Sequence, residues 1–108
     1  MTNITFLRWP DGHYHTFDVL EAAPGAGLGT APFAINLFGS VTGEYLDENA
    51  AMHGFVRLPH GNSVTFDARD GGSSAGQGTR PSTLNLWGSV TGWYIDANNL
   101  SHGFVWIP

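Results

Sequence analysis

The segment Gly39-Ser40-Val41-Thr42-Gly43 recurs unchanged as Gly88-Ser89-Val90-Thr91-Gly92, 49 residues further along the chain. Around it, residues 6–54 align with residues 55–103 without a gap, and 24 of the 49 positions are identical. Self-similarity at a fixed period is the signature of a repeat architecture. The dense, ungapped match indicates that a single structural unit has been duplicated.

A second short segment occurs three times at the same period. Phe6-Leu7-Arg8-Trp9-Pro10 recurs as Phe55-Val56-Arg57-Leu58-Pro59, and again as Phe104-Val105-Trp106-Ile107-Pro108. We therefore expect one domain over residues 1–108. It would consist of two 49-residue repeats, 6–54 and 55–103, followed by a partial third copy at 104–108.

Each unit has the features of β-structure, and no helical periodicity of useful length occurs. Pro10-Asp11-Gly12 and Pro59-His60-Gly61 are turn signals between two short β-prone runs, so each predicts a hairpin. Loops rich in Gly, Ala or Ser are expected from 19 to 31 and from 68 to 80. The expected strands are 33–37, 40–47, 52–58 and 62–67 in the first unit, 82–86, 89–96 and 101–107 in the second, and 4–9 and 13–18 at the N-terminus.

Four short antiparallel strands in a period of about 40 to 50 residues are typical of a β-propeller blade. The sequence thus predicts an all-β chain with material for two four-stranded blades. Because propellers close with about four to eight blades, we expect homo-oligomerisation to complete the ring. A trimer with six blades is favoured, and a tetramer with eight is the second choice.

The ends of the chain leave one question about this ring open. The blade outside 33–67 would combine C-terminal strands with N-terminal ones, and we expect the latter to come from a neighbouring chain. The strand type at 6–10 is present again at 104–108, so the shared blade has one strand more than it needs. Either one copy is displaced, or it adds a fifth strand at the edge.

A family resemblance rests on the pattern Ile35-Asn36-x-x-Gly39-Ser40-Val41-Thr42-Gly43-x-Tyr45-x-Asp47, followed by His53-Gly54-Phe55. This pattern resembles the bacterial extracellular HAF repeat family, and the resemblance covers residues 6–108. It implies a propeller-like tandem repeat and carries no defined biochemical activity. By architecture alone, the expected ring is similar to small lectins that build six blades from two-blade chains, although their sugar-binding motif is not found here.

Composition excludes several classes of partner. The net charge is −5, with four arginines and no lysine, so the basic stripe that nucleic-acid binding requires is missing. No apolar run reaches the length of a membrane span, and no polybasic anchor occurs. With no cysteine, disulfides and thiolate metal sites are excluded. The compartment is left open, and an extracellular location follows only if the native parent protein is exported.

Two histidines stand at a recurring distance from an aspartate. His53 follows Asp47 by six residues, and His102 follows Asp96 by the same distance. Such a pair could serve as an acid–base pair or in a metal site, or it could tie two strands by a buried hydrogen bond. Because every unit repeats the pair, we favour the structural interpretation.

Two further patterns are weak as catalytic or metal sites. His13 and His15 alternate on one strand and so share a face, but no third metal ligand is evident. Gly72-Ser73-Ser74-Ala75-Gly76 matches a nucleophile motif, yet it lacks the strand-to-helix elbow that the motif requires. We therefore expect no catalytic residue, no metal and no cofactor, and a protein that is not an enzyme.

The most informative aromatic residues lie where the two units differ. A constraint of the fold should act on both copies alike, so a tryptophan present in only one copy marks either free drift of the surface or a site specific to one blade. The role of such a tryptophan could be ligand binding or packing at a subunit seam. Tryptophan faces beside amide groups suit carbohydrate. The candidate ligand-binding residues are Trp9, Asn85, Trp87, Trp93 and Trp106.

Together these features favour a non-catalytic, homo-oligomeric β-propeller that binds a ligand, with carbohydrate as the expected class. Identical weak sites on one ring would gain affinity through multivalency. The alternative is a self-assembling propeller building block, natural or engineered, without a specific ligand.

Overall fold

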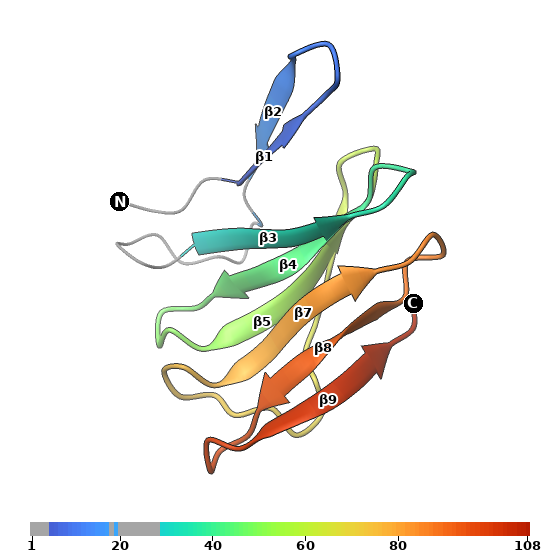
Figure 1. Ribbon diagram of the computed structural model, residues 1–108. Coiled ribbons are helices and arrows are strands. Elements are labelled where there is room, and N and C mark those ends of the chain that lie inside the picture. Colours follow the sequence, from blue (N-terminus) through green and yellow to red (C-terminus); the bar gives the residue numbers. More distant parts are fainter. Residues whose placement is uncertain (1–4, 18, 20–28) are drawn as a thin grey trace.

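The computed structural model describes residues 5–17, 19 and 29–108, and it confirms the all-β prediction (Figure 1). Among these residues there is no helix, and hence no helix that could cross a membrane. The strands are β1 (Thr5–Arg8), β2 (Tyr14–Phe17), β3 (Gly29–Ile35), β4 (Val41–Leu46), β5 (Met52–Arg57), β6 (Ser63–Phe66), β7 (Gly78–Leu84), β8 (Val90–Ile95) and β9 (Ser101–Trp106).

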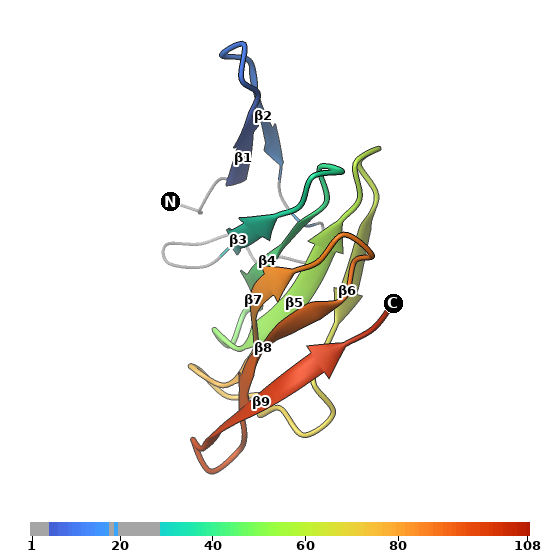
Figure 2. The same ribbon diagram turned by 45° about the vertical axis from the view of Figure 1, so that its right-hand side comes forward.

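The strands form a hairpin and two meanders. β1 pairs with β2, and we call this pair the N-terminal hairpin. β3, β4, β5 and β6 pair antiparallel in chain order and form the first meander, while β7, β8 and β9 form the second. The two meanders join where β7 meets β5 in parallel at the single pair Met52 and Gly78. Figure 2 shows β6 beside β5, on the side of β5 that faces away from β7.

The 49-residue period is present in the structure as well as in the sequence. The bounds of β3, β4 and β5 recur 49 residues later in β7, β8 and β9, and β2 recurs as β6. β1 and β9 are both copies of β5, so the strand type that occurs once too often forms a strand at both ends of the chain. β1 pairs with β2, whereas β9 forms the last strand of the sheet among the described residues.

The expected bounds of two strands, 33–37 and 82–86, were wrong. β3 begins at Gly29 and β7 at Gly78, inside segments that were predicted to be loop. Proline usually marks the end of a strand, but here Pro32 and Pro81 lie within strands at shifts of register. A Cβ atom on Gly43 would collide with the Ala31 carbonyl, so the glycines of the recurring Val-Thr-Gly let this irregular pairing close.

The core consists of two clusters that occupy equivalent places in successive units. In the first cluster, side chains of β1 and β2 pack against β4 and β5. In the second, side chains of β5 and β6 pack against β8 and β9. The first cluster contains Val19, Val41, Tyr45 and Phe55, with Leu7 and Phe17 packed against it. The second contains Val56, Phe66 and Val90, with Leu58, Leu84, Phe104 and Trp106 packed against it.

Aromatic contacts repeat between these two clusters. Phe17 meets Phe55 edge to face with centroids 6.3 Å apart, and Phe66 meets Phe104 in the same way at 6.1 Å. Arg57 lies 4.8 Å over the ring of Phe17, and its counterpart Trp106 stacks 4.5 Å from Phe66. One packing arrangement is therefore used twice, first between the N-terminal hairpin and the first meander and then between the two meanders.

Replacing Phe55 with alanine should lower the free energy of unfolding by about 3 to 5 kcal/mol, because the side chain is fully buried and its removal leaves a cavity. Urea unfolding followed by tryptophan fluorescence would measure the change. Phe6→Ala is the matched control, since Phe6 is the copy of Phe55 but is 60% exposed. Equal losses for both variants would contradict the packing described here.

Candidate functional site

Two pockets lie at equivalent places in successive units. The larger, of about 450 Å³, opens between the N-terminal hairpin and the first meander. The smaller, of about 240 Å³, opens between the two meanders. Each is lined by the turn between the first two strands of a meander and by a copy of the Phe-x-Arg-x-Pro segment. The positions shared between them are Leu7 with Val56, Trp9 with Leu58, Leu37 with Leu86, Phe38 with Trp87, Gly39 with Gly88, Arg57 with Trp106, and Pro59 with Pro108.

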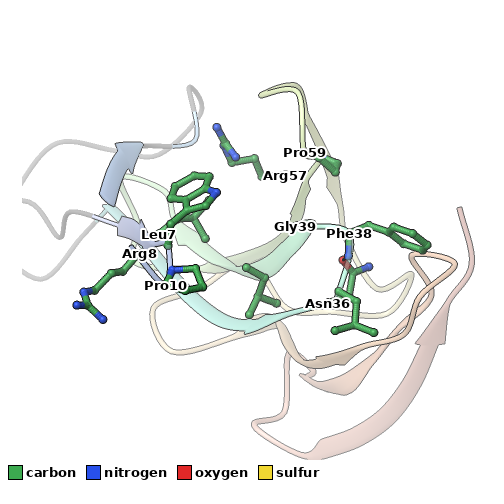
Figure 3. A pocket seen from close by; sticks show the side chains of 11 residues that line it. Leu7, Arg8, Pro10, Asn36, Phe38, Gly39, Arg57 and Pro59 are labelled. Atoms are coloured by element: carbon green, nitrogen blue, oxygen red, sulfur yellow. The ribbon is translucent and has the colours of Figure 1, made fainter. Parts of the chain in front are cut away.

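Figure 3 shows the two walls of the larger pocket. Leu7, Arg8 and Pro10 form one wall, and the β3–β4 turn with Pro59 forms the other. Arg57 lies between them at the top of the view, whereas the ring of Phe38 extends away from the β1 wall. The lining contains two arginines and no carboxylate, so the larger pocket is positive although the chain as a whole is acidic.

Three of the four predicted tryptophans line these two pockets. Trp9 lines the larger pocket and is 46% exposed. Trp87 and Trp106 line the smaller one, where Trp87 is 81% exposed and Trp106 is held against Phe66. Three of the four candidate tryptophans therefore lie at pocket positions where the aligned copies carry different residues.

Asn85 shapes the turn that carries Trp87. Its side-chain Oδ1 accepts hydrogen bonds from the backbone N–H groups of Trp87 and Ser89, at 3.0 and 2.9 Å. Asn36 closes the first-unit turn in the same way, and its Nδ2 also donates to the Asn85 carbonyl at 3.0 Å. The two turns thus lie side by side, and Asn85 acts on the pocket through the turn geometry.

Trp93 lies on β8 and lines neither pocket. Its ring faces Arg80, whose guanidinium carbon is 5.5 Å from the ring centroid. Arg80 also reaches across to Glu44 on the first meander, with Nε–Oε2 and Nη2–Oε1 distances of 3.1 and 3.2 Å. Burial raises the pKa of the Glu44 carboxyl, although the Arg80 guanidinium opposes that shift. This bidentate pair joins the two meanders.

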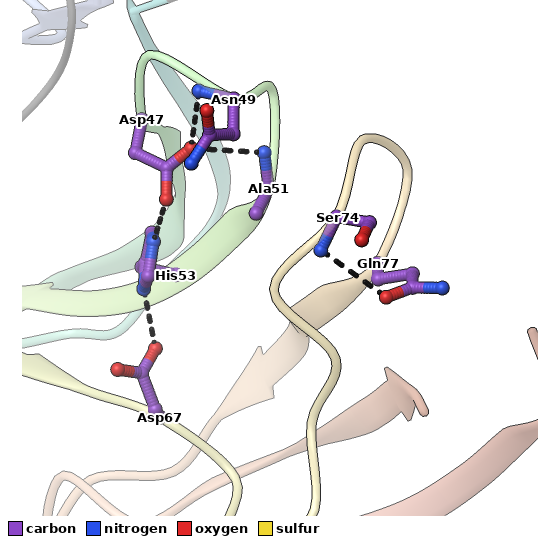
Figure 4. Close-up of polar contacts among 7 residues, drawn as sticks. All are labelled: Asp47, Asn49, Ala51, His53, Asp67, Ser74 and Gln77. Atoms are coloured by element: carbon purple, nitrogen blue, oxygen red, sulfur yellow. Dashed lines mark hydrogen bonds and ion pairs between the residues drawn. The ribbon is translucent and has the colours of Figure 1, made fainter. Parts of the chain in front are cut away.

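The predicted pairing of histidine with aspartate occurs in both units, and in the first unit it has a third member (Figure 4). His53 Nε2 lies 2.7 Å from Asp47 Oδ2, and His102 Nε2 lies 2.8 Å from Asp96 Oδ2. His53 Nδ1 also lies 2.6 Å from Asp67 Oδ1, at the end of β6. Sequence reasoning missed this third residue, although the repeated Thr-Phe-Asp segment was the available signal.

The two carboxylates change the titration of His53. Partial burial acts to lower its pKa, but the hydrogen bonds to Asp47 and Asp67, together with their charges, outweigh burial and raise it. Burial acts to raise the pKa of Asp47, but hydrogen bonds from His53 and from the Ala51 and Asn49 backbone lower it on balance. When it is protonated, His53 can donate to both carboxylates and so tie β5 to the β4–β5 turn and to the end of β6.

The other candidate groups do not assemble into a catalytic or metal site within the described part of the chain. His13 pairs with the exposed Asp11 at 2.9 Å. No three potential metal ligands cluster among the described residues. In the serine-containing loop, the backbone N–H of Ser74 donates to Gln77 Oε1 at 3.2 Å, and no helix follows.

The raised pKa of His53 predicts a pH-dependent stability. Its contribution should be complete below about pH 6.5 and lost as the pH rises through the raised folded-state value, while that of Asp47 should be lost as the pH falls below about 4. Between about pH 6 and pH 9, wild type should lose more unfolding free energy in urea than His53→Gln. His60→Gln, at an exposed turn, is the control. An identical pH dependence in wild type and His53→Gln would refute the assignment.

No family model matches this chain, and neither the curated proteins nor the solved structures that were searched contain a match.

Proposed function

We propose that this chain is a non-catalytic, homo-oligomeric β-propeller module that binds carbohydrate in the pockets between consecutive blades. The observation that carries the proposal is the recurrence of one pocket at two successive sheet interfaces, with the aromatic and charged residues of its lining varied between copies. The repeated packing would form each pocket, and the residues that vary between the two pockets would determine which ligand each one binds.

The propeller part of the proposal is supported by the meanders. The first meander has four antiparallel strands in chain order, as a blade does, and the second has three strands of the same types. The same aromatic contact also joins the N-terminal hairpin to the first meander and the first meander to the second, although β3 to β9 belong to one seven-stranded mixed sheet. A ring of three chains would hold six blades and remains the favoured closure, with four chains and eight blades second.

The carbohydrate part is supported by the chemistry of the pockets. Exposed aromatic faces suit the apolar face of a sugar ring, and neighbouring donors suit its hydroxyl groups. Trp87 supplies such a face at one pocket, while Trp9 and the guanidinium groups of Arg8 and Arg57 line the other. The larger pocket, at about 450 Å³, has the size of a small-molecule site.

Binding to a glycan array by the assembled protein, followed by titration of the best glycan, tests this proposal. Trp87→Ala and Arg57→Ala should each weaken binding roughly tenfold, the equivalent of about 1.4 kcal/mol. Glu48→Gln is the control, because Glu48 lies at an exposed turn outside both pockets. The absence of binding to any glycan would overturn the carbohydrate proposal.

One observation favours the alternative of self-assembly without a ligand. Trp106 stacks on Phe66 at 4.5 Å with an interplanar angle of 12°, so one candidate tryptophan is already engaged in packing between the meanders. Such packing would need no ligand. The alternative predicts the same ring with no glycan bound.

Native mass spectrometry tests the ring itself. We expect a closed assembly of several 11.6 kDa chains, with three copies as the favoured number. Dilution should dissociate the ring together with any multivalent gain in glycan affinity. A stably folded monomer at micromolar concentration would contradict the assembly, whatever the result of the glycan array.

A further inference from the structure

We infer that a second copy of this chain docks head to tail on the open edge and face of the second meander. In this arrangement β2 of one copy pairs with β9 of the other and gives up its own β1. The inference rests on the ring in the proposed function and not on carbohydrate binding. It is carried by contacts that the first unit makes and that the second unit, with the same residues, leaves unmade.

The first unmade contact is at His102. In the first unit, His53 binds Asp47 through one ring nitrogen and Asp67 of the β6 end through the other. His102 binds Asp96 in the same way, but its second nitrogen has no partner among the described residues. The missing group is a carboxylate at the end of a strand paired with β9.

The second unmade contact is at Gly103. A Cβ atom on Gly54 would lie 2.6 Å from the ring of Phe66, so β5 needs glycine there to let the ring of β6 approach. Gly103 is the copy of Gly54, yet the nearest atom to a Cβ there is the Gly92 oxygen at 3.9 Å. The glycine is kept where nothing in the monomer fills the space beside it.

The N-terminal hairpin carries the complementary half. β6 ends with Phe66-Asp67, the two residues that meet Gly54 and His53, and β2 continues with the identical pair Phe17-Asp18. Asp18 itself lies outside the described residues. By sequence, β2 is therefore equipped to pair with a His-Gly strand.

β1, the present partner of β2, is not such a strand. Where β5 has His53-Gly54 and β9 has His102-Gly103, the β1 copy has Ile4-Thr5. The matched halves of the motif thus stand apart: His-Gly lies on β9, whereas Phe17 ends β2 and Asp18 follows it in the sequence. A head-to-tail contact between two copies would bring these halves together. Before that contact forms, β1 occupies the position beside β2 that β9 of the other copy would take.

The second meander exposes residues whose copies in the first meander are buried. Val56 is 3% exposed because it packs in the second cluster, whereas its copy Val105 is 65% exposed. Thr42 is fully buried between neighbouring sheets, whereas its copy Thr91 is exposed. A second copy would cover this face as the second meander covers the first, with Val105 taking the place of Leu7 in the first cluster.

A substitution between the two units fits this seam. Within the chain, Glu44 binds Arg80 across the interface between the meanders. In the proposed contact, the copy of Glu44 is Trp93, and the copy of Arg80 is Ala31 on the second chain. A charged pair at one interface would be replaced at the next by a large aromatic residue over a small one, which fits its exposure of 40% in the monomer.

The asparagine turns provide a further match. Asn36 Nδ2 donates to the Asn85 carbonyl and so links consecutive turns. Within the described part of the chain, the Nδ2 of Asn85 has no acceptor. In the head-to-tail contact it would donate to the Asn36 carbonyl of the second copy and extend the chain of linked turns. The exchange would also change the larger pocket: Trp106 and Ile107 of one copy would replace Arg8 and Trp9 of the other, whereas Arg57 and the β3–β4 turn would still line it.

Disulfide trapping tests the exchange in the full chain, which has no natural cysteine. Applying the register of β5 and β6 to the proposed pair places Val105 opposite His15 of the other copy, as Val56 is opposite Val64. The double variant Val105→Cys, His15→Cys should form disulfide-linked multimers on oxidation, and a reductant should return them to single chains. The matched control, Val56→Cys with Val64→Cys, should cross-link only within one chain.

The outcomes separate this inference from the proposed function. Multimers linked through the Val105 and His15 positions support the exchange even if no glycan binds. An oligomer by native mass without these cross-links would overturn the exchange and leave the ring standing, whereas a monomer would overturn both. Gly103→Val provides a second test, because the monomer has room for the side chain. It should reduce assembly at least tenfold without loss of cooperative unfolding, and an unchanged oligomer would refute the role of this glycine.

Discussion

The fold depends on one contact, in which the aromatic ring at the end of a two-stranded edge lies on the face of the next sheet. Phe17 makes this contact with Phe55, and Phe66 makes it with Phe104. A single meander could not bury both of its faces, and the first meander does so only because a copy of this contact lies on either side. Its strands β4 and β5 are therefore almost entirely buried, while the equivalent strands β8 and β9 are half open.

The same contact explains why identical residues have different surroundings in the two units. Burial is a property of the neighbour and not of the residue, so Val56 and Val105 differ in exposure although their local sequence and strand pairing agree. Free edges and uncovered apolar faces are a liability in solution. A low share of charged residues, 12% of the chain, fits a surface of which part is covered by further copies.

Sequence reasoning predicted the all-β class, the period and most strands, because the duplication shows which differences are tolerated. It failed where local rules met tertiary context. Pro32 and Pro81 indicated loop, but facing glycines let the chain bulge there and continue the strand. The pairing of His53 with Asp47 followed from spacing across one turn, whereas Asp67 reaches the same ring through strand pairing, which spacing alone does not reveal.

Some of the positions at which the two copies differ are related through the contacts that they make. Arg57 and Trp106 both present a flat group to a phenylalanine, so the exchange preserves packing while removing a charge from the neighbouring pocket. In the proposed head-to-tail contact, Trp93 and Ala31 would take the places that Glu44 and Arg80 have between the meanders, so the charged pair would be replaced as a pair. Two kinds of interface that alternate around a ring would each need its own matched set. Such alternation would favour two unequal units in a duplicated chain, because the first type of unit would then bind the second type more tightly than it binds another copy of itself.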